Sequence, residues 1–481
     1  MSNSEISKYR VLSQTESLCP VCLKKIPAFR VTDGCDVFFE KQCEVHGKFS
    51  VVIWRNNPPF KTWMRPKIPV QPPVCYAAIS KGCPFDCGLC VSHRQITCTA
   101  LIEITQRCNL SCKYCFASSE KSSVSDPDIQ TIEFLFSRVK EAAPSCNIQL
   151  SGGEPTLRDD LPEIIEMGRR KGFGFIQLNT NGLRLAEQKD YAKRLKEAGL
   201  ASVFLQFDGI SDEVYASLRG RKLLAEKILA IDRCAKAGIG VVLVPMIVPG
   251  VNTHEIGSIL KFALKQYPAV RGIHFQPVSY FGRYPKKVEN HDRITIPEIL
   301  SALEFQSDGM VKASDFKPPG CENALCSFNG KFLVMNSEQL KPVVTDNSVC
   351  CNKPLRADIG ARQSITSVAR QWSGVEGQGS GFRVQGSGIE GLGSGIREKR
   401  PVRVGQGRVE EMCDLDIDGF LEFVRTRSFS ISGMAFQDVW NLDLERLKDC
   451  CIHVVSNDGR LIPFCAYNLT DIQNKPIYRG I

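Results

Sequence analysis

From about residue 99 the chain alternates between short apolar runs and longer segments with helical periodicity. Short apolar runs indicate buried strands, and apolar residues three and four positions apart indicate amphipathic helices. The runs predict strands at residues 100–105, 147–151, 175–180, 202–207, 240–248 and 272–278. The segments between them predict helices at residues 131–143, 160–171, 191–200 and 223–238. Strand–helix units repeated in this order favour a parallel sheet curled into all or part of a barrel.

The regions on either side of this array have a different amino-acid composition. Residues 1–98 are rich in cysteine, proline and short strand-like pieces, which is typical of a small module stapled by metal. Residues 372–397 carry repeated Gly-Ser-Gly triplets, which indicate a flexible insert. We therefore predict three regions, at residues 1–98, 99–320 and 321–481, with the last interrupted by a flexible insert at about 360–410.

The composition is that of a globular protein. The chain has 481 residues, of which 43% are hydrophobic, and no uncharged apolar run is long enough to span a membrane. The N-terminus lacks the apolar stretch of a signal peptide, so we expect a cytoplasmic protein. The net charge of +9 is spread along the chain, so no nucleic-acid partner is expected. Peripheral contact with anionic lipid head groups is a secondary expectation from the same charge.

Cysteine usage is the most informative feature of the composition. The 22 cysteines fall into groups along the chain. The cytosol keeps thiols reduced, so a disulfide framework is not expected there. Clustered cysteines in such a chain more often bind metal.

One cysteine group follows the first predicted barrel strand. The stretch "TQRCNLSCKYCFASS" holds Cys108, Cys112 and Cys115 in a C-x3-C-x2-C pattern. Its place at the carboxyl end of a barrel strand is that of an active site. A 4Fe–4S cluster normally takes four cysteines, so three would leave one iron open to a small molecule. A structural zinc loop is the alternative, although zinc modules favour separated C-x2-C pairs.

Further motifs stand at the ends of later predicted strands, namely "SGGEP" at 151–155, "NTNG" at 179–182 and "QFDG" at 206–209. Together with the cysteine loop and its Tyr114, this combination resembles the radical S-adenosylmethionine (SAM) enzymes. The resemblance implies an α/β fold with a partial (βα)6 radical SAM barrel, an N-terminal metal-binding module and a C-terminal auxiliary iron–sulfur domain. It also implies that a set of residues binds the cofactor: Tyr114, Gly152, Gly153, Glu154, Asn179, Asn181, Gln206 and Asp208.

The resemblance also implies a chemistry. SAM would bind the open iron of a 4Fe–4S cluster through its amino and carboxylate groups, with Glu154 accepting a hydrogen bond from the ammonium. Reductive cleavage, fed by an electron donor such as ferredoxin or flavodoxin, would give a 5′-deoxyadenosyl radical that activates a C–H bond. The sequence does not identify a catalytic residue beyond these.

The remaining cysteines predict further metal sites. Cys83, Cys87, Cys90 and Cys98 predict a second cluster, with a zinc knuckle as the alternative. A rubredoxin-like iron or a structural zinc is predicted nearer the N-terminus, from Cys19, Cys22, Cys43 and His46, with Cys35 as an alternative ligand. A third set is predicted from Cys321 and Cys326, completed by Cys451 or Cys450 and by Cys465.

This cysteine layout resembles the archaeal tetraether lipid synthases. The resemblance implies one or two auxiliary 4Fe–4S clusters, a mononuclear metal and C–C coupling of isoprenoid lipid tails. The alternative is radical methylation of a pterin in methanopterin synthesis. A lipid requires a long apolar tunnel, whereas a pterin requires a short pocket with amide and carboxylate partners. A non-enzymatic zinc-binding or nucleic-acid-binding protein is a third hypothesis, and it would require a concentrated basic face.

Overall fold

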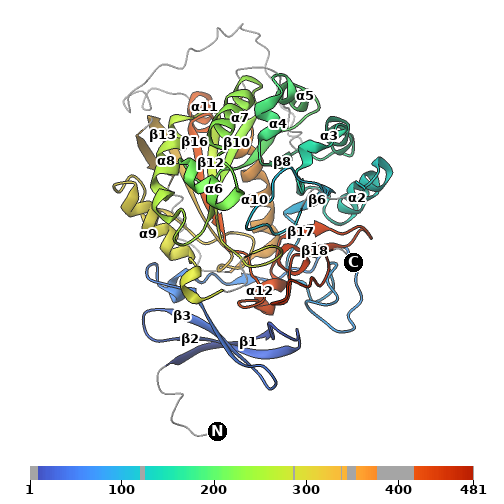
Figure 1. The fold of residues 1–481 in the computed structure, drawn as a ribbon, viewed down its shortest axis with the longest axis vertical. Coiled ribbons are helices and arrows are strands. Elements are labelled where there is room, and N and C mark those ends of the chain that lie inside the picture. The colour runs from blue at the N-terminus through green and yellow to red at the C-terminus, as the bar shows by residue number, and fades with distance from the viewer. Residues whose placement is uncertain are drawn as a thin grey trace.

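The computed structural model describes residues 9–119, 125–284, 288–336, 338–343, 354–375 and 417–479. A small N-terminal sheet lies beside a larger body built around one long sheet (Figure 1). Residues 376–416, which hold the predicted Gly-Ser-Gly triplets, are outside the described residues.

The N-terminal sheet is antiparallel, in the order β1 (Arg10–Leu18), β2 (Lys25–Thr32), β3 (Val37–Cys43) and β4 (Gly47–Trp54). Burial alternates along β3, because one face of the sheet packs against the rest of the protein. Lys41 points to that face, and its Nζ donates to Ser17 Oγ at 3.0 Å and to the Val439 carbonyl at 2.6 Å. After the sheet come α1 (Phe60–Trp63) and β5 (Lys67–Ile68).

Six parallel strands form the centre of the long sheet and confirm the predicted array. They are β6 (Thr99–Thr105), β7 (Asn147–Gly152), β8 (Ile176–Thr180), β9 (Ser202–Gln206), β10 (Gly240–Val244) and β12 (Val270–Pro277), in that order. The predicted strand at 240–248 is interrupted after Val244 and resumes as β11 (Met246–Ile247). The interruption falls at Pro245, which has no backbone N–H to donate to a neighbouring strand.

Helices connect the strands and confirm the predicted periodicity. They are α2 (Ile129–Ala142), α3 (Leu161–Arg170), α4 (Leu183–Glu187), α5 (Tyr191–Glu197), α6 (Asp212–Arg219), α7 (Leu224–Lys236), α8 (Ile256–Lys265) and α9 (Ile296–Gln306). Short 3₁₀ turns lie at Pro155–Leu157, Thr253–Glu255, Asn290–Asp292 and Ala313–Asp315. The Asp128 side chain caps α2 by accepting from Thr131 N at 2.7 Å, which satisfies one of the free N–H groups at the helix start.

The C-terminal residues extend the barrel sheet at both edges. At the β12 edge, β16 (Ser428–Met434) pairs in parallel with β12, followed by β13 (Ser327–Asn336) and β14 (Gln339–Pro342). At the β6 edge, β17 (Ile452–Val455) pairs in parallel with β6 and carries β18 (Leu461–Pro463). The remaining C-terminal elements are β15 (Leu355–Arg356), α11 (Ile417–Arg427), α12 (Leu444–Lys448) and α13 (Phe464–Tyr467).

Part of the predicted flexible insert is ordered. Residues 360–372 belong to α10 (Ala357–Trp372), so the start of the insert at about 360 is wrong. The helix packs against β10, β12 and β16. Gly240 allows this approach, because a Cβ there would lie 2.3 Å from the Trp372 carbonyl oxygen. The buried apolar residues of α10 therefore pack against strands that are distant in the sequence, and the local sequence does not show these contacts.

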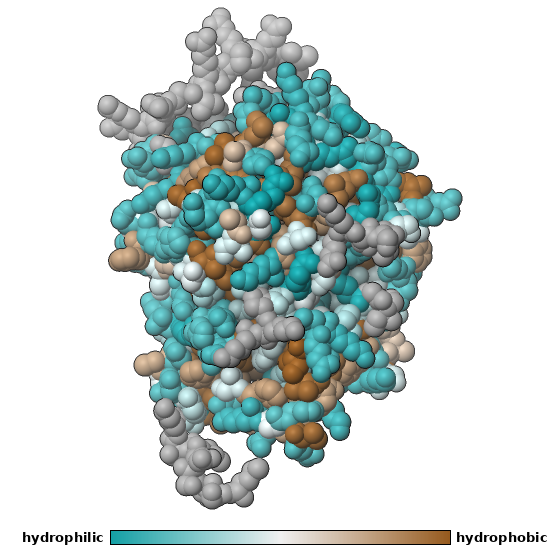
Figure 2. Space-filling model, viewed as in Figure 1, coloured by the Kyte–Doolittle hydropathy of each residue, from teal (hydrophilic) through white to brown (hydrophobic). Residues whose placement is uncertain are grey.

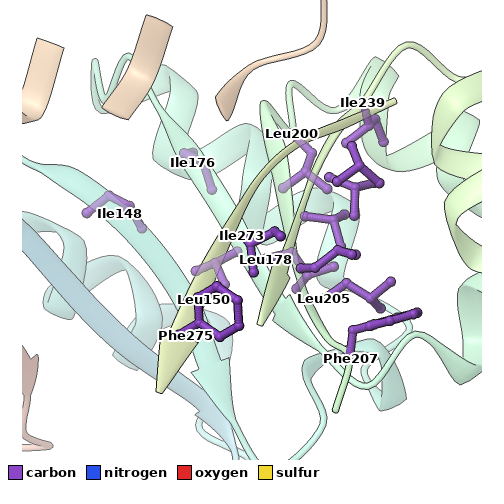
Figure 3. Packing of buried hydrophobic residues seen from close by; sticks show 14 of the residues in the cluster. Ile148, Leu150, Ile176, Leu178, Leu200, Leu205, Phe207, Ile239, Ile273 and Phe275 are labelled. Carbon is purple, nitrogen blue, oxygen red and sulfur yellow. The ribbon is translucent and has the colours of Figure 1, made fainter. Parts of the chain in front are cut away.

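The main core lies between the barrel strands and the surrounding helices. Figure 3 shows strand residues such as Ile148, Leu150, Leu178, Leu205 and Ile273 pointing into this layer, and all are 0–1% exposed. On the face drawn in Figure 2, apolar residues are scattered in small groups among hydrophilic ones, as on most globular proteins. Among the described residues, no helix combines the length and apolar character that crossing a bilayer requires.

Candidate active site and metal centres

A cavity of about 590 Å³ runs through the interior of the barrel. Each of the six barrel strands contributes wall residues, including Gln149, Gln177 and His274. The cavity reaches from the cysteine loop after β6 to Cys98, which immediately precedes β6. Its two ends are therefore separated by a strand of seven residues, about 20 Å.

The cysteine loop lies at the carboxyl end of β6, as predicted. Cys108, Cys112 and Cys115 are half-buried and line the cavity. Cys115 and Arg283 exchange two backbone hydrogen bonds of 2.8 and 2.9 Å, and Arg283 Nε donates to the Cys112 carbonyl at 2.7 Å. Burial raises the pKa of Cys108 to about 12, so metal binding would displace its proton.

The glycines of "SGGEP" allow β7 to pass very close to this loop. A Cβ on Gly152 would lie 2.1 Å from the Thr105 carbonyl oxygen, and one on Gly153 would lie 2.1 Å from the Arg107 carbonyl oxygen. Gly153 N donates to Thr105 O at 2.8 Å. Both glycines line the cavity, but the requirement for glycine here comes from the close approach of the two chain segments.

Glu154 connects the ends of two neighbouring strands. Its Oε1 accepts from the hydroxyls of Thr156 and Thr180, both at 2.6 Å, and its Oε2 accepts from Asn181 N at 2.7 Å. The side chain is 1% exposed and lines the cavity. Its visible role is to join the turns after β7 and β8, and its contact with a SAM ammonium stays a prediction.

Three other predicted residues also line the cavity. Asn181 Nδ2 donates to Asn109 Oδ1 at 2.7 Å and so contacts the cysteine loop. Asn179 Oδ1 is buried and has no hydrogen-bond partner among the described residues. Tyr114 belongs to the loop itself and also faces the cavity. An unpartnered buried oxygen beside the cavity is the kind of group that a polar ligand would satisfy.

The structure places Asp208 behind the cavity wall, and its contact with the cofactor stays a prediction. Its side chain is fully buried and does not line the cavity. Asp208 accepts two hydrogen bonds of 2.7 Å from the Arg219 guanidinium, one from Nε and one from Nη2. Arg219 lines the cavity, and its pKa is raised by Asp208 and Cys112 despite the opposing effect of burial. Asp208 therefore orients a cation that faces the site.

Two further residues near the cavity, Arg219 and Lys227, were not predicted from the sequence. Arg219 ends α6, where Gly220 caps the helix in the left-handed region, with φ of 81°. Lys227 is fully buried in α7, and its Nζ donates to Gln206 Oε1 at 2.9 Å and to the Asn181 carbonyl. Burial lowers the pKa of Lys227 to about 8. Arg219 lies ten residues after Gly209 of "QFDG", so no short spacing in the sequence pointed to its ion pair with Asp208.

These residues fit a 4Fe–4S cluster that binds SAM, and the cysteine loop with Cys108, Cys112 and Cys115 is therefore named the SAM loop. The loop offers three thiols to the cavity, and Arg219, Glu154 and Asn179 surround the same space with a cation and oxygen acceptors. The thiols would hold the cluster, and the cation and acceptors match the carboxylate and ammonium of SAM. A cluster with SAM bound supplies the radical that activates a C–H bond.

A second group of ligands lies in the N-terminal sheet. Cys19, Cys22, Cys43 and His46 present their ligand atoms within 4.8 Å of one another. Cys22 Sγ lies 4.0 Å from Cys43 Sγ, and His46 Nδ1 lies 3.4 and 3.5 Å from Cys19 Sγ and Cys43 Sγ. A metal–sulfur bond of about 2.3 Å gives tetrahedral edges of about 3.8 Å, so this spacing suits one ion. Cys35 is exposed and is not in this group.

The structure corrects the predicted partners of Cys98. Its thiol groups with those of Cys321 and Cys451, all within 4.8 Å of one another, instead of completing a set with Cys83, Cys87 and Cys90. The three thiols are 2–6% exposed and line the cavity end opposite the SAM loop.

Glu322 stands beside this trio. Cys321 Sγ lies 2.6 Å from Glu322 Oε2, and Cys451 Sγ lies 3.6 Å from the same oxygen. Burial and the charge of the Cys321 thiolate raise the pKa of Glu322 to about 8. A carboxyl group that belongs to none of the predicted ligand sets thus joins the thiols at this end of the cavity.

Two further groups of cysteines affect one another's pKa values. A hydrogen bond between the Cys83 and Cys87 thiols raises the pKa of Cys87 well above its ordinary value, with Cys90 adding to the effect. Burial raises the pKa of Cys450, and the charges of Cys465 and Cys326 raise it further. Cys326 and Cys465 thus act electrostatically on Cys450. Of the predicted set of Cys321, Cys326, Cys451 or Cys450, and Cys465, only Cys321 and Cys451 are in the group with Cys98.

Comparison with known families matches this geometry. Residues 102–263 match the family model described as Radical SAM superfamily, and residues 11–55 match the HMPTM N-terminal zinc ribbon domain. The chain is 35% identical over 478 residues to 7,8-dihydro-6-hydroxymethylpterin dimethyltransferase of Methanocaldococcus jannaschii, covering 95% of this chain and 93% of that protein. The chain belongs to the radical SAM superfamily.

Other relatives of this radical SAM enzyme align over a smaller share of the chain. The probable GTP 3′,8-cyclase of Methanothermobacter marburgensis is 34% identical over 176 residues, covering 36% of this chain and 56% of that protein. Among solved structures, native anSMEcpe with bound AdoMet and a peptide has a TM-score of 0.35 and 20% identity, covering 44% of this chain and 58% of that one. Streptococcus suis SuiB has a TM-score of 0.37 and 14% identity, covering 45% of this chain and 47% of that one.

Proposed function

We propose that this radical SAM enzyme transfers methyl groups to a reduced pterin. The observation that carries the proposal is the similarity to the pterin dimethyltransferase, because it extends over nearly the whole chain and includes the N-terminal ribbon. The sequence analysis ranked coupling of lipid tails first and pterin methylation second. The relatives described above are a pterin methyltransferase and a GTP cyclase, so they favour the second hypothesis.

The cavity wall supports a polar substrate. Gln149, Gln177, Gln206 and Gln276 bring amide groups to it from four barrel strands, and Gln149 Nε2 donates to Gln177 Oε1 at 2.8 Å. Each amide has two donor hydrogens and an oxygen with two lone pairs, so these groups can pair with the donors and acceptors of a pterin ring beyond the hydrogen bonds that they already make, whereas a lipid tail would leave that further capacity unsatisfied. Desolvating such groups against an alkyl chain costs about 1–3 kcal/mol each.

His274 adds an imidazole to the same wall. Its Nδ1 lies 2.9 Å from Ser432 Oγ, which leaves Nε2 for a ligand in the cavity. Burial lowers the pKa of His274 to about 4, so near pH 7 the ring is neutral and one nitrogen is an acceptor. We assign His274 and the glutamines to recognition of the heterocycle, and an electron donor of the ferredoxin or flavodoxin class to reduction of the cluster.

The proposal is tested with the full chain, reconstituted anaerobically with iron and sulfide. The enzyme is incubated with SAM, a reductant and either 7,8-dihydro-6-hydroxymethylpterin or archaeal diether lipid. We expect 5′-deoxyadenosine together with a pterin whose mass has increased by one or two methyl groups. Parallel reactions with methyl-labelled SAM and with a reduced folate carrying a one-carbon unit identify the methyl donor. Joined lipid chains and an unchanged pterin would contradict the proposal.

A further inference from the structure

The thiol trio at the far end of the cavity stands beside a buried acid, Glu322, whose carboxylate has no cation in direct contact among the described residues. The charge of Lys67 acts on this carboxylate, but Lys67 Nζ donates to the Glu322 backbone carbonyl instead. Glu322 is 7% exposed, and no arginine or lysine side chain in the described ranges forms an ion pair with its carboxylate. The other buried carboxylates are neutralised or satisfied in two ways. Glu103, Asp208, Asp438 and Asp443 each pair with an arginine, whereas Glu154 has no such pair and both of its oxygens accept from hydroxyl or backbone N–H donors. A buried carboxylate beside three thiols is costly unless a cation lies among them.

The surroundings hold Glu322 in the position of a ligand. Ser327 Oγ donates to its Oε1, which leaves Oε2 directed at Cys321 and Cys451. Lys67 Nζ donates to the Glu322 backbone carbonyl, and Gln95 Nε2 donates to the Cys321 carbonyl at 2.6 Å. The main chain is thus held at both Cys321 and Glu322, and the only contacts of Oε2 among the described residues are with the thiols of Cys321 and Cys451.

We propose that Glu322 is the fourth ligand of the metal centre held by Cys98, Cys321 and Cys451, and that it is the ligand that exchanges. Three thiolates bind iron strongly, whereas a carboxylate oxygen is a harder and weaker ligand for a thiolate-bound metal. Glu322 and the three thiols all line the cavity. A donor atom of a molecule in the cavity can therefore replace the carboxylate while the thiolates keep the metal in place.

This inference does not depend on whether the substrate is a pterin. The metal centre would bind a molecule in the cavity at the amino end of β6, about 20 Å along the strand from the SAM loop. The class of ligand it would take is a small anion or a heteroatom donor that can bind iron in place of a carboxylate.

The test uses the full chain with Cys108, Cys112 and Cys115 all replaced by alanine, so that the SAM-loop cluster is absent. The protein is reconstituted with iron and sulfide, reduced, and examined by electron paramagnetic resonance with and without isotope-labelled cyanide. We expect cyanide to shift the spectrum and to show hyperfine coupling. Glu322→Cys in the same background should keep the iron content and lose the cyanide coupling, because a fourth thiolate does not exchange.

Two further variants distinguish the loss of a metal ligand from a nonspecific effect of a substitution near the thiols. Glu322→Gln is nearly isosteric and neutral, so it should keep the fold and bind cyanide at several-fold lower concentration. Ser364→Ala removes a hydroxyl 3.3 Å from Cys321 Sγ without removing a carboxylate, so it should behave like the parent. The proposal is overturned if the parent takes up no cyanide, if Glu322→Cys takes it up equally, or if Glu322→Gln leaves the spectrum and cyanide affinity unchanged.

Discussion

Gly153 is the residue on which the position of the SAM loop depends most directly. A Cβ there would lie 2.1 Å from the Arg107 oxygen and 2.7 Å from its carbonyl carbon, and neither backbone atom can rotate away. We expect Gly153→Ala to lower the free energy of unfolding by about 1–3 kcal/mol and to reduce the iron retained at the loop. Iron content after reconstitution and a denaturation curve measure the two effects.

Gly174→Ala is the matched control for this change. Nothing lies within 4 Å of a Cβ at Gly174, and its φ is not in the left-handed region. Alanine there should leave iron content unchanged and leave stability equal or about 0.4–1 kcal/mol higher. Equal iron loss in both variants would contradict the steric explanation.

At the scale of the element, α10 depends on Trp372 for its place against the barrel. The side chain is 8% exposed, its ring centroid lies 5.6 Å from that of Phe204, and Nε1 donates to Ser430 Oγ at 2.8 Å. We expect Trp372→Ala to lower the free energy of unfolding by about 3–5 kcal/mol, because it leaves a cavity in a packed layer. The shift of the urea midpoint measures this loss.

Phe305→Ala serves as the control for removal of a large ring, since Phe305 is 84% exposed at the surface of α9. Its effect should stay within about 0.5 kcal/mol. A similar loss in both variants would show that α10 does not depend on the Trp372 contact.

At the scale of the whole molecule, the N-terminal metal site is separate from the barrel sites. We expect Cys43→Ser to remove one metal ion per chain and to leave the iron of the barrel in place, because its ligands all lie in the small sheet. Metal analysis of the purified chain measures both. Cys35→Ser should change nothing, since Cys35 is exposed and outside the ligand group. Loss of barrel iron from Cys43→Ser would show that the two metal regions fold together.

The sequence determined the features that short spacing encodes. The six barrel strands follow from local apolar runs, the SAM loop from cysteines within eight residues, and the N-terminal ligands from two close pairs on adjacent hairpins. Hydrophobic periodicity and ligand spacing are patterns over a few residues, so they can be recognised in the sequence before the fold is known.

Only the tertiary structure decided which distant residues meet. Cys98, Cys321 and Cys451 come together because β17 pairs with β6 and the segment after α9 returns to the amino end of the barrel. The helix α10 packs against β10, β12 and β16 by burial of residues far apart in sequence. The Arg219–Asp208 ion pair joins the turn after β9 to the end of α6, eleven positions along the chain. Such contacts leave no fixed spacing in the chain, and they bring Cys98, Cys321, Cys451 and Glu322 together at one end of the cavity.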